Sequence, residues 1–243
     1  LVRSRGLGDV YKRQVQDPRI TRKVFPDQNV GLRGAVNDVF GTSKADLVGI
    51  LPNDFIVTPG WTRPIAEAHA EIPELGMVGC WHYPLDDFDE QAARKAGKIQ
   101  TFGRHQVLRH PWTGGGAGLI KTETVRRFPP LESNATTRYW LRMALAGYVH
   151  GYYYPLIPVE HMDDPRSPHC LYKNDEELQQ CREVSLVLKD YGITTMEARW
   201  RRRAEVLHNL NAEPWQAEYY VGWRKKLRRA RQKIRRMVTG AYN

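Results

Sequence analysis

One acidic residue in this chain stands where an α/β protein usually holds its ligands. Asp54 follows the apolar run 45–51 (ADLVGIL), which Pro52-Asn53 ends. A short apolar run bounded by such turn residues predicts a buried strand, and open α/β sheets bind ligands beyond the carboxyl ends of their strands. Carboxylate oxygens are the ligands that hard divalent cations prefer. The position of Asp54 therefore predicts metal-assisted chemistry at the end of this strand.

Two other groups of residues contain side chains or backbone suited to chemistry. Histidine and cysteine side chains, which can each bind zinc, occur at His161, His169, Cys170 and Cys181, but their spacing fits no compact zinc-finger pattern. The glycine-rich run 114–118 lacks the preceding strand and the later acidic residue of a dinucleotide-binding fingerprint. That run predicts either a close approach of the backbone to a bound ligand or a flexible turn.

Alternating strands and helices must position these residues. The first half of the chain predicts a βαβ layout with a largely parallel sheet. Its predicted elements are a helix over 29–44, extended segments over 45–51 and 55–57, a helix over 63–72 and a strand over 76–81. The second half predicts a long polar loop over 84–112, helices over 121–127 and 136–146, a strand over 148–159 with its later part at a sheet edge, and helices over 174–190, 194–210 and 214–238.

Several motifs follow one another in a recognisable order. They are Asn29, Gly31, Asn37, Asp54, Pro59-Gly60-Trp61, the run 114–118, Arg142-x4-Gly147-Tyr148 and His161. This ordered set, over residues 20–165, resembles the bacterial-type family 2 glycosyltransferases of the GT-A fold. No single motif is specific, so the resemblance rests on their order. It implies an α/β fold with a GT-A-type (Rossmann-like), mostly parallel central sheet flanked by helices, here followed by a C-terminal helical extension.

The resemblance implies an enzyme that moves a sugar, with inversion, from a nucleotide-sugar donor to a glycan or lipid-linked acceptor. Asp54 and His161 would hold a divalent metal, Mn²⁺ or Mg²⁺, against the leaving diphosphate. The implied donor-binding residues are Asn29, Arg33, Asn37, Asn53 and Asp54. The alternative for Arg33 is a solvated surface residue. The implied acceptor contacts are Trp112, Gly115, Gly116 and Trp140, and packing in the core is the alternative for Trp140.

The chain departs from the family pattern in two places. The family's metal motif usually has two acidic positions, whereas Pro52-Asn53-Asp54 retains one. The family's Glu-Asp pair before the Gly-Tyr motif corresponds to Ala135-Thr136, so the nearest candidate base for the acceptor hydroxyl is Glu132. Glu132 as an ordinary loop residue is the alternative. A non-catalytic relative that binds nucleotide or carbohydrate therefore stays open.

The first fourteen residues, LVRSRGLGDVYKRQ, show neither helical nor strand periodicity. Residues 4–14 resemble the in-frame translation of a transposase-type sequencing adapter, which occurs at the ends of metagenomic contigs. A genuine basic arm is the alternative. If residues 1–14 derive from an adapter, we expect them to have no function and the natural sequence to continue upstream.

The formal charge of +10 is concentrated outside the expected catalytic body. Residues 224–243 hold nine Lys or Arg and no acid, and residues 1–14 contribute +3. The remaining residues, 15–223, therefore balance at −2. A near-neutral body predicts no broad basic face, so a nucleic-acid partner is not favoured, although the tail alone could bind one.

The tail has the pattern of a helix that lies on a membrane. Trp223, Leu227, Ala230, Ile234 and Met237 form one apolar stripe on a helix that is otherwise almost wholly basic. Residues 223–238 thus predict contact with an anionic membrane surface, with a solvated or partner-packing helix as the alternative.

The expected organisation is adapter-derived residues 1–14, a partial GT-A domain over 15–170, a helical extension over 171–222 and the tail helix over 223–243. The three cysteines favour a reducing compartment. No secretory signal pattern opens the sequence, and no apolar run is long enough to cross a membrane. We therefore expect a cytoplasmic protein, peripheral on the inner face of the membrane.

Overall fold

The computed structural model describes residues 18–20, 22, 24, 30–113, 116–133, 136–170, 172–183, 188–189 and 192–239, with side chains up to residue 234. The chain divides into two units, residues 1–30 and residues 31–243. Everything below concerns the second unit. The adapter-like residues 1–14, Asn29 and Gly115 lie outside the described residues.

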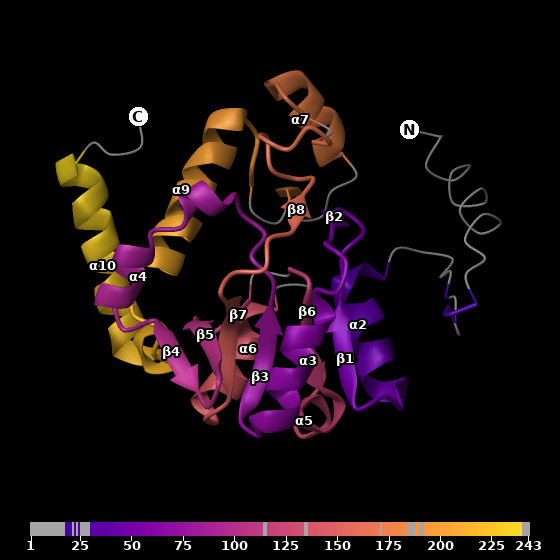
Figure 1. Ribbon diagram of the computed structural model, residues 1–243. Helices are drawn as coiled ribbons and strands as arrows, with labels where there is room; N and C mark the ends of the chain where they lie inside the picture. Colours follow the sequence, from indigo (N-terminus) through magenta and orange to yellow (C-terminus); the bar gives the residue numbers. More distant parts are fainter. Residues whose placement is uncertain are drawn as a thin grey trace. The chain divides into compact units, whose positions relative to one another are not determined.

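A six-stranded mixed sheet forms the centre of this unit (Figure 1). Its order is β1-β6-β3-β7-β5-β4, with β1 Leu47–Ile50, β6 Gly118–Lys121, β3 Leu75–Gly79, β7 Val149–Tyr154, β5 His105–Arg109 and β4 Ile99–Phe102. The α/β class is confirmed, but the mostly parallel sheet is wrong. Among the described strands only β3 and β7 pair in parallel, because β6 and β5 run against their neighbours.

The antiparallel strands leave the expected ligand edge in place. Strand β6 pairs antiparallel with both β1 and β3, so β1 and β3 point the same way, and β7 is parallel to β3. The carboxyl ends of β1, β3 and β7 therefore lie at one edge of the sheet. A small second sheet, β2 Phe55–Ile56 with β8 Glu160–His161, lies beyond this edge (Figure 1).

The polarity of the segment 84–112 predicted a long loop, and this prediction is wrong. The segment forms the short 3₁₀ helix η1 Leu85–Asp87, the helix α4 Glu90–Lys95 and the hairpin β4–β5. Gly103 closes this hairpin with a positive φ of 58°, a conformation that glycine adopts without strain. Strand β5 pairs with β7, so β7 is an interior strand. It ends at Tyr154, and the later part of the predicted strand, for which an edge position was expected, lies outside it.

Helices cover both faces of the sheet. On one face, α2 Gly31–Thr42, α5 Thr122–Arg126 and α6 Thr137–Leu145 pack Val36, Phe40 and Trp140 against Met77 and Ile120. On the other face, α3 Thr62–Glu71 buries Ile65 and Ala68 against β3. Gly147 follows α6 with φ 96°, which agrees with the C′ position expected for it. These packed faces hold the ligand edge rigidly.

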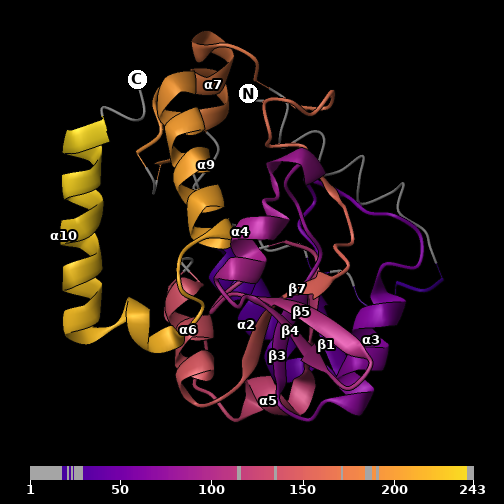
Figure 2. The same ribbon diagram turned by 60° about the vertical axis from the view of Figure 1, so that its left-hand side comes forward.

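The C-terminal region is helical, as expected. It contains α7 Asp175–Arg182, α9 Met196–Asn211, the 3₁₀ helix η2 Ala217–Tyr220 and α10 Gly222–Thr239. Leu210 of α9 packs with Trp81, Ala93 and Leu108, which joins the helical region to the sheet and to α4. Figure 2 shows α9 beside α4, with α10 at the margin of the molecule.

Candidate site beyond the sheet edge

The pairing of β2 with β8 brings the two predicted metal ligands together. Phe55 lies opposite His161 in this antiparallel pair, and the Met162 amide donates a hydrogen bond of 2.8 Å to the Asp54 carbonyl. As a result, Oδ2 of Asp54 lies 3.3 Å from Nε2 of His161, although 107 positions separate them in the sequence. The spatial proximity that sequence reasoning required is present.

Asp54 keeps one carboxylate oxygen without a partner. Its Oδ1 is enclosed and accepts no hydrogen bond from the described residues. Burial acts to raise the pKa of Asp54, but the hydrogen bond and charge of His161 outweigh it, so the pKa stays below its usual value. The phenyl ring of Phe55 stacks on the His161 imidazole, with 4.5 Å between ring centres, and so fixes its plane. The pair thus combines an anionic carboxylate with an oriented imidazole.

His82 is a third polar residue here, and sequence reasoning missed it. It follows β3, is 3% exposed, and its ring centre lies 5.8 Å from that of His161 and 5.6 Å from that of Phe55. Burial lowers the pKa of His82 to about 3, which leaves the ring neutral, and Nδ1 has no hydrogen-bond partner among the described residues. The signal was its place directly after a buried strand, the same position that singled out Asp54.

Gly116 makes room for His82. A Cβ atom added at Gly116 would lie 2.6 Å from Nδ1 of His82, closer than real contacts allow. The backbone at Gly116 therefore approaches the His82 ring closely, and Gly116 itself is buried; the approach to a sugar stays a prediction. Asn53, the residue before Asp54, is exposed.

The donor atoms of Asp54 and His161 would suit a divalent cation whose remaining ligands come from a bound substrate and water. Within the described ranges, no group of three or more His, Cys, Asp or Glu residues is placed to hold a metal, so the zinc alternative gains no support. Asp54 and His161 would supply two ligands, and the unpartnered Oδ1 would gain a partner. Mg²⁺-type cations often take one or two protein carboxylates and complete their shell with phosphate oxygens and water. Such a site would be completed by a diphosphate.

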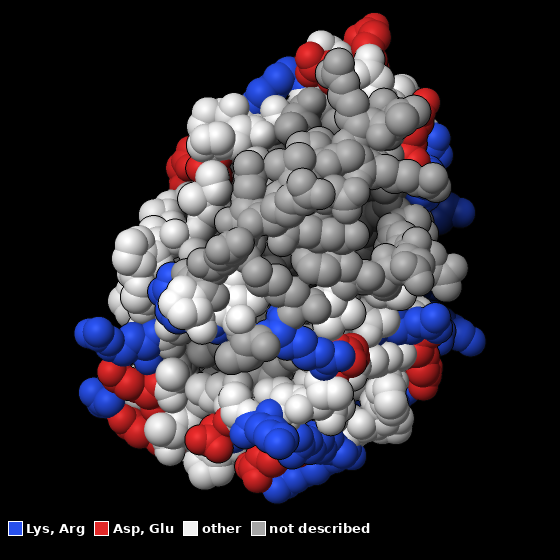
Figure 3. Space-filling view, turned by 90° about the vertical axis from the view of Figure 1, so that its right-hand side faces the viewer, with Lys and Arg blue, Asp and Glu red and all other residues white. Residues whose placement is uncertain are grey.

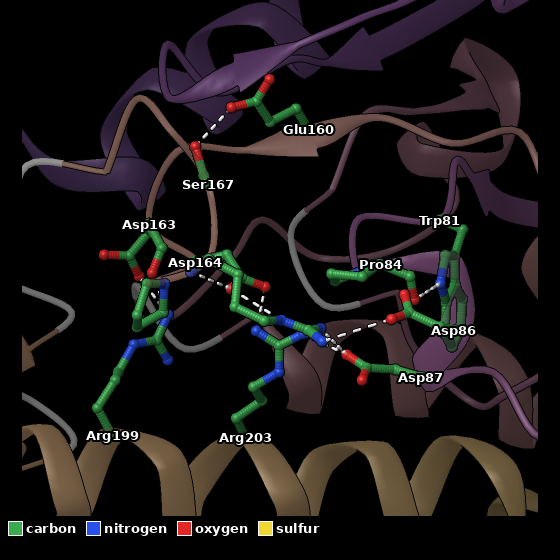
Figure 4. A network of polar contacts seen from close by, with 12 residues as sticks. Trp81, Pro84, Asp86, Asp87, Glu160, Asp163, Asp164, Ser167, Arg199 and Arg203 are labelled. Atoms are coloured by element: carbon green, nitrogen blue, oxygen red, sulfur yellow. Dashed lines mark hydrogen bonds and ion pairs between the residues drawn. The ribbon is translucent and has the colours of Figure 1, made fainter. Parts of the chain in front are cut away.

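Helix α9 fixes the loop that follows His161 (Figure 4). Arg199 binds Asp163 at 2.7 Å, and Arg203 forms ion pairs with Asp164 and with Asp87 of η1. The Asp164 amide donates to the His161 carbonyl at 2.9 Å, which is turn geometry. These two aspartates are thus engaged by arginines, and α9 holds the loop in place.

Three predicted residues meet one another in a separate cluster. The Asn37 side chain bonds both the amide and the carbonyl of Leu131, at 2.8 and 3.0 Å, so its hydrogen-bonding groups serve the backbone. Arg33 donates to the Glu132 carbonyl at 3.3 Å. The Glu132 carboxylate accepts from Arg142 at 2.9 Å. A cavity of about 190 Å³ lies here, between the segment 130–133 and α6.

The two predicted acceptor tryptophans have packing partners. Trp112 contacts Tyr220 of η2 edge-on, with 4.7 Å between ring centres, and His110 at 4.5 Å. Trp140 is 1% exposed and packs with Phe40 and Tyr139, so its indole offers no face to a sugar. The structure therefore favours the core alternative for Trp140.

Comparison with known proteins adds no family to this geometry. No protein-family model and no curated protein matches the chain. Within the described helices, none combines the length and the apolar character needed to cross a membrane.

Proposed function

We propose that this chain is a GT-A-type, family 2-like glycosyltransferase domain that binds a nucleotide-sugar donor at Asp54 and His161. The observation that carries the proposal is the 3.3 Å approach of these two side chains beyond the carboxyl ends of β1 and β3. The order of motifs in the sequence, from Asn29 to His161, supports the same conclusion. The acceptor would be a glycan or a lipid-linked sugar, and the protein would work in the cytoplasm.

In the transfer reaction, the acceptor oxygen would attack the anomeric carbon, the bond from that carbon to the diphosphate would break, and the hydroxyl proton would pass to a general base, for which Glu132 is the nearest candidate in the sequence. When held by Asp54 and His161, Mn²⁺ or Mg²⁺ supplies positive charge against the departing diphosphate. The stacked Phe55 keeps the His161 ring in one plane, and the neutral His82 fills the interior behind it. These contacts preorganise the pair without a rearrangement during the reaction.

The matched ends of strand β1 offer a direct test. Asp54 follows this strand, whereas Asp46 precedes it and is exposed. Calorimetry would measure the binding of uridine, guanosine and thymidine diphosphates in the presence of Mn²⁺. We expect Asp54→Asn to weaken the best of these by more than about 100-fold, beyond the loss typical of an outer-shell contact to a metal. Asp46→Asn should bind as the unmodified chain does. Equal binding by the two variants would remove Asp54 from the site.

A second candidate is a non-catalytic binding domain of the same fold. Glu132, the nearest candidate base, is engaged by Arg142, and the metal motif retains one acid. A carboxylate held by an arginine is not free to accept the acceptor's proton. Diphosphate binding that depends on Asp54, without hydrolysis or transfer from any of a panel of nucleotide sugars, would favour this candidate.

Nucleic-acid binding has less support. On the face shown in Figure 3, the described Lys and Arg side chains lie among Asp and Glu side chains and gather into no broad basic patch. A polyanion-binding face needs many phosphate contacts, each from a cationic side chain. Helix α10 is the most basic helix described, with nine Lys or Arg residues and no acidic residue.

A further inference from the structure

Helix α10 has an apolar stripe that is exposed and does not pack against the described part of the protein. Trp223, Leu227 and Ile234 are 68%, 43% and 56% exposed, and Ala230 between them is exposed as well. Their spacings of four, three and four residues place them on one side of the helix. A surface helix of a globular protein normally packs such a stripe against the core. Here the stripe contacts solvent along the described side chains of the helix.

The opposite side of α10 is the one that packs on the body. Arg228 and Gln232 are the less exposed residues of this helix, and they lie roughly opposite the stripe on the helical projection. Arg228 lies over the ring of Tyr220 at 4.7 Å and pairs with Glu213 at 3.6 Å. The inward contacts are therefore made by polar residues, and the exposed apolar stripe lies on the other side of the helix.

Cationic side chains border the stripe on both sides. Lys226 and Lys233 lie along one margin, and Arg224 and Arg231 lie along the other; all four are exposed. The helix contains nine Lys or Arg residues and no acidic residue. A second copy of this helix is a poor occupant, because it would bring the same positive charge against these margins.

We propose that α10 binds the surface of an anionic lipid bilayer. The indole of Trp223 and the side chains of Leu227 and Ile234 enter the boundary between headgroups and acyl chains, and the bordering cations contact lipid phosphates. A nucleic acid would satisfy the cations but would leave the apolar stripe in water, so the combination of both features selects the bilayer. This inference does not rest on the sugar-transfer reaction. Binding of α10 to the bilayer would, however, keep the Asp54–His161 site near lipid-linked acceptors.

Vesicle co-sedimentation of the whole chain tests the proposal with two matched pairs of variants. The vesicles contain either phosphatidylcholine alone or equal parts of phosphatidylcholine and phosphatidylglycerol. Lys226→Gln/Lys233→Gln removes two margin cations, and Lys44→Gln/Lys95→Gln removes two exposed lysines from the body. Leu227→Gln/Ile234→Gln removes apolar surface and keeps every charge. Because all these α10 positions are exposed, far-ultraviolet circular dichroism should show the same fold for each variant.

We expect binding to the anionic vesicles and little binding to phosphatidylcholine alone. Loss of the two margin cations should weaken partitioning about 30-fold, since each basic residue near the surface contributes about a factor of five. Loss of the two apolar side chains should weaken it by at least about 10-fold. The body variant should bind as the unmodified chain does.

Three results would overturn the proposal. One is equal partitioning onto the two kinds of vesicle. Another is unchanged vesicle binding by Leu227→Gln/Ile234→Gln together with tight binding of duplex DNA, which would make α10 a polyelectrolyte-binding helix. The third is a dimer in sedimentation velocity that this variant dissociates, with no vesicle binding by the unmodified chain.

Discussion

Helices α9 and α10 are both rich in arginine, yet α9 turns two of its arginines into the interior whereas α10 exposes three of its own. In α9, Arg199 and Arg203 turn inward and reach aspartates of the loops after β3 and β8. In α10, Arg224, Arg229 and Arg231 are exposed, and the helix has no acid of its own. Two arginine-rich helices thus have different roles: α9 forms ion pairs in the interior, and α10 presents cations at the surface.

The acids elsewhere in the chain decide this difference. Asp87 and Asp164 lie 116 and 39 positions before Arg203, and folding brings both to the same guanidinium. An arginine buried with two carboxylates is costly to remove, because these carboxylates then keep only the half-exposed Arg166 as a cationic partner. An exposed arginine interacts with water and salt, and little stability depends on it. The local sequence of a basic helix therefore does not reveal which role its arginines have.

Replacing one arginine in each helix should separate the two roles most widely. Arg203→Met removes the buried guanidinium that Asp87 and Asp164 share and leaves them only the half-exposed Arg166. We expect a loss of up to about 3–5 kcal/mol in the free energy of unfolding. Arg229→Met, in exposed α10, should change it by less than about 0.5 kcal/mol. Urea titrations followed by circular dichroism measure both. Similar losses in the two variants would show that α9 does not depend on its interior ion pairs.

A buried lysine at the junction of the two helices provides a smaller, pH-dependent effect. Lys98 is 0% exposed, and its ammonium donates to the carbonyls of Asn209 and Glu213, at 3.1 and 2.8 Å, at the carboxyl end of α9. Burial lowers the pKa of Lys98 to about 7. An unfolded lysine keeps its proton up to about pH 10.4. Between about pH 7 and pH 10, Lys98 is therefore protonated in the unfolded state and increasingly neutral in the folded state.

Because the unfolded state binds more protons than the folded state in this range, the free energy of unfolding should rise with pH. Between about pH 7 and 8.5, Lys98 should make the unfolding free energy rise by up to about 1.4 kcal/mol per pH unit. Lys98→Met should remove this rise, and Lys95→Met, an exposed lysine on α4, should retain it. The measurement is a series of urea titrations across this pH range. An identical slope in the two variants would mean that Lys98 stays protonated in the folded protein.

Local patterns predicted most of the described helices, but only four of the eight described strands, β1, β2, β3 and β7, and not how the strands pair. The strands around Val48, Val78 and Tyr152 are apolar enough to read from the sequence. The hairpin β4–β5 was missed because residues such as Gln100, Thr101 and Gln106 made it resemble a polar loop. The direction of β6 depends on pairing with β1 and β3, and no local residue specifies it.

The site was predictable where one short strand pair determines it. Asp54 was identified by its position after an extended segment and His161 by the family resemblance, and β2–β8 pairing brings them together. Asn37 and Trp140 could not be assigned, because an amide can bind backbone as well as a ligand and an indole can pack as well as stack. His82 was overlooked since the resemblance gave it no role, although its place after β3 matches that of Asp54 after β1.

The most direct test of the Asp54–His161 site is an NMR titration of the histidine-labelled chain with Mn²⁺ and a nucleoside diphosphate. Paramagnetic broadening should remove the ring signals of His161 and His82 first. The signal of His69, which lines a cavity at the amino end of β1, should stay sharp. The Asp54→Asn variant should lose this selectivity. A sharp His161 signal at saturating Mn²⁺ and diphosphate, or equal broadening in Asp54→Asn, would contradict the site.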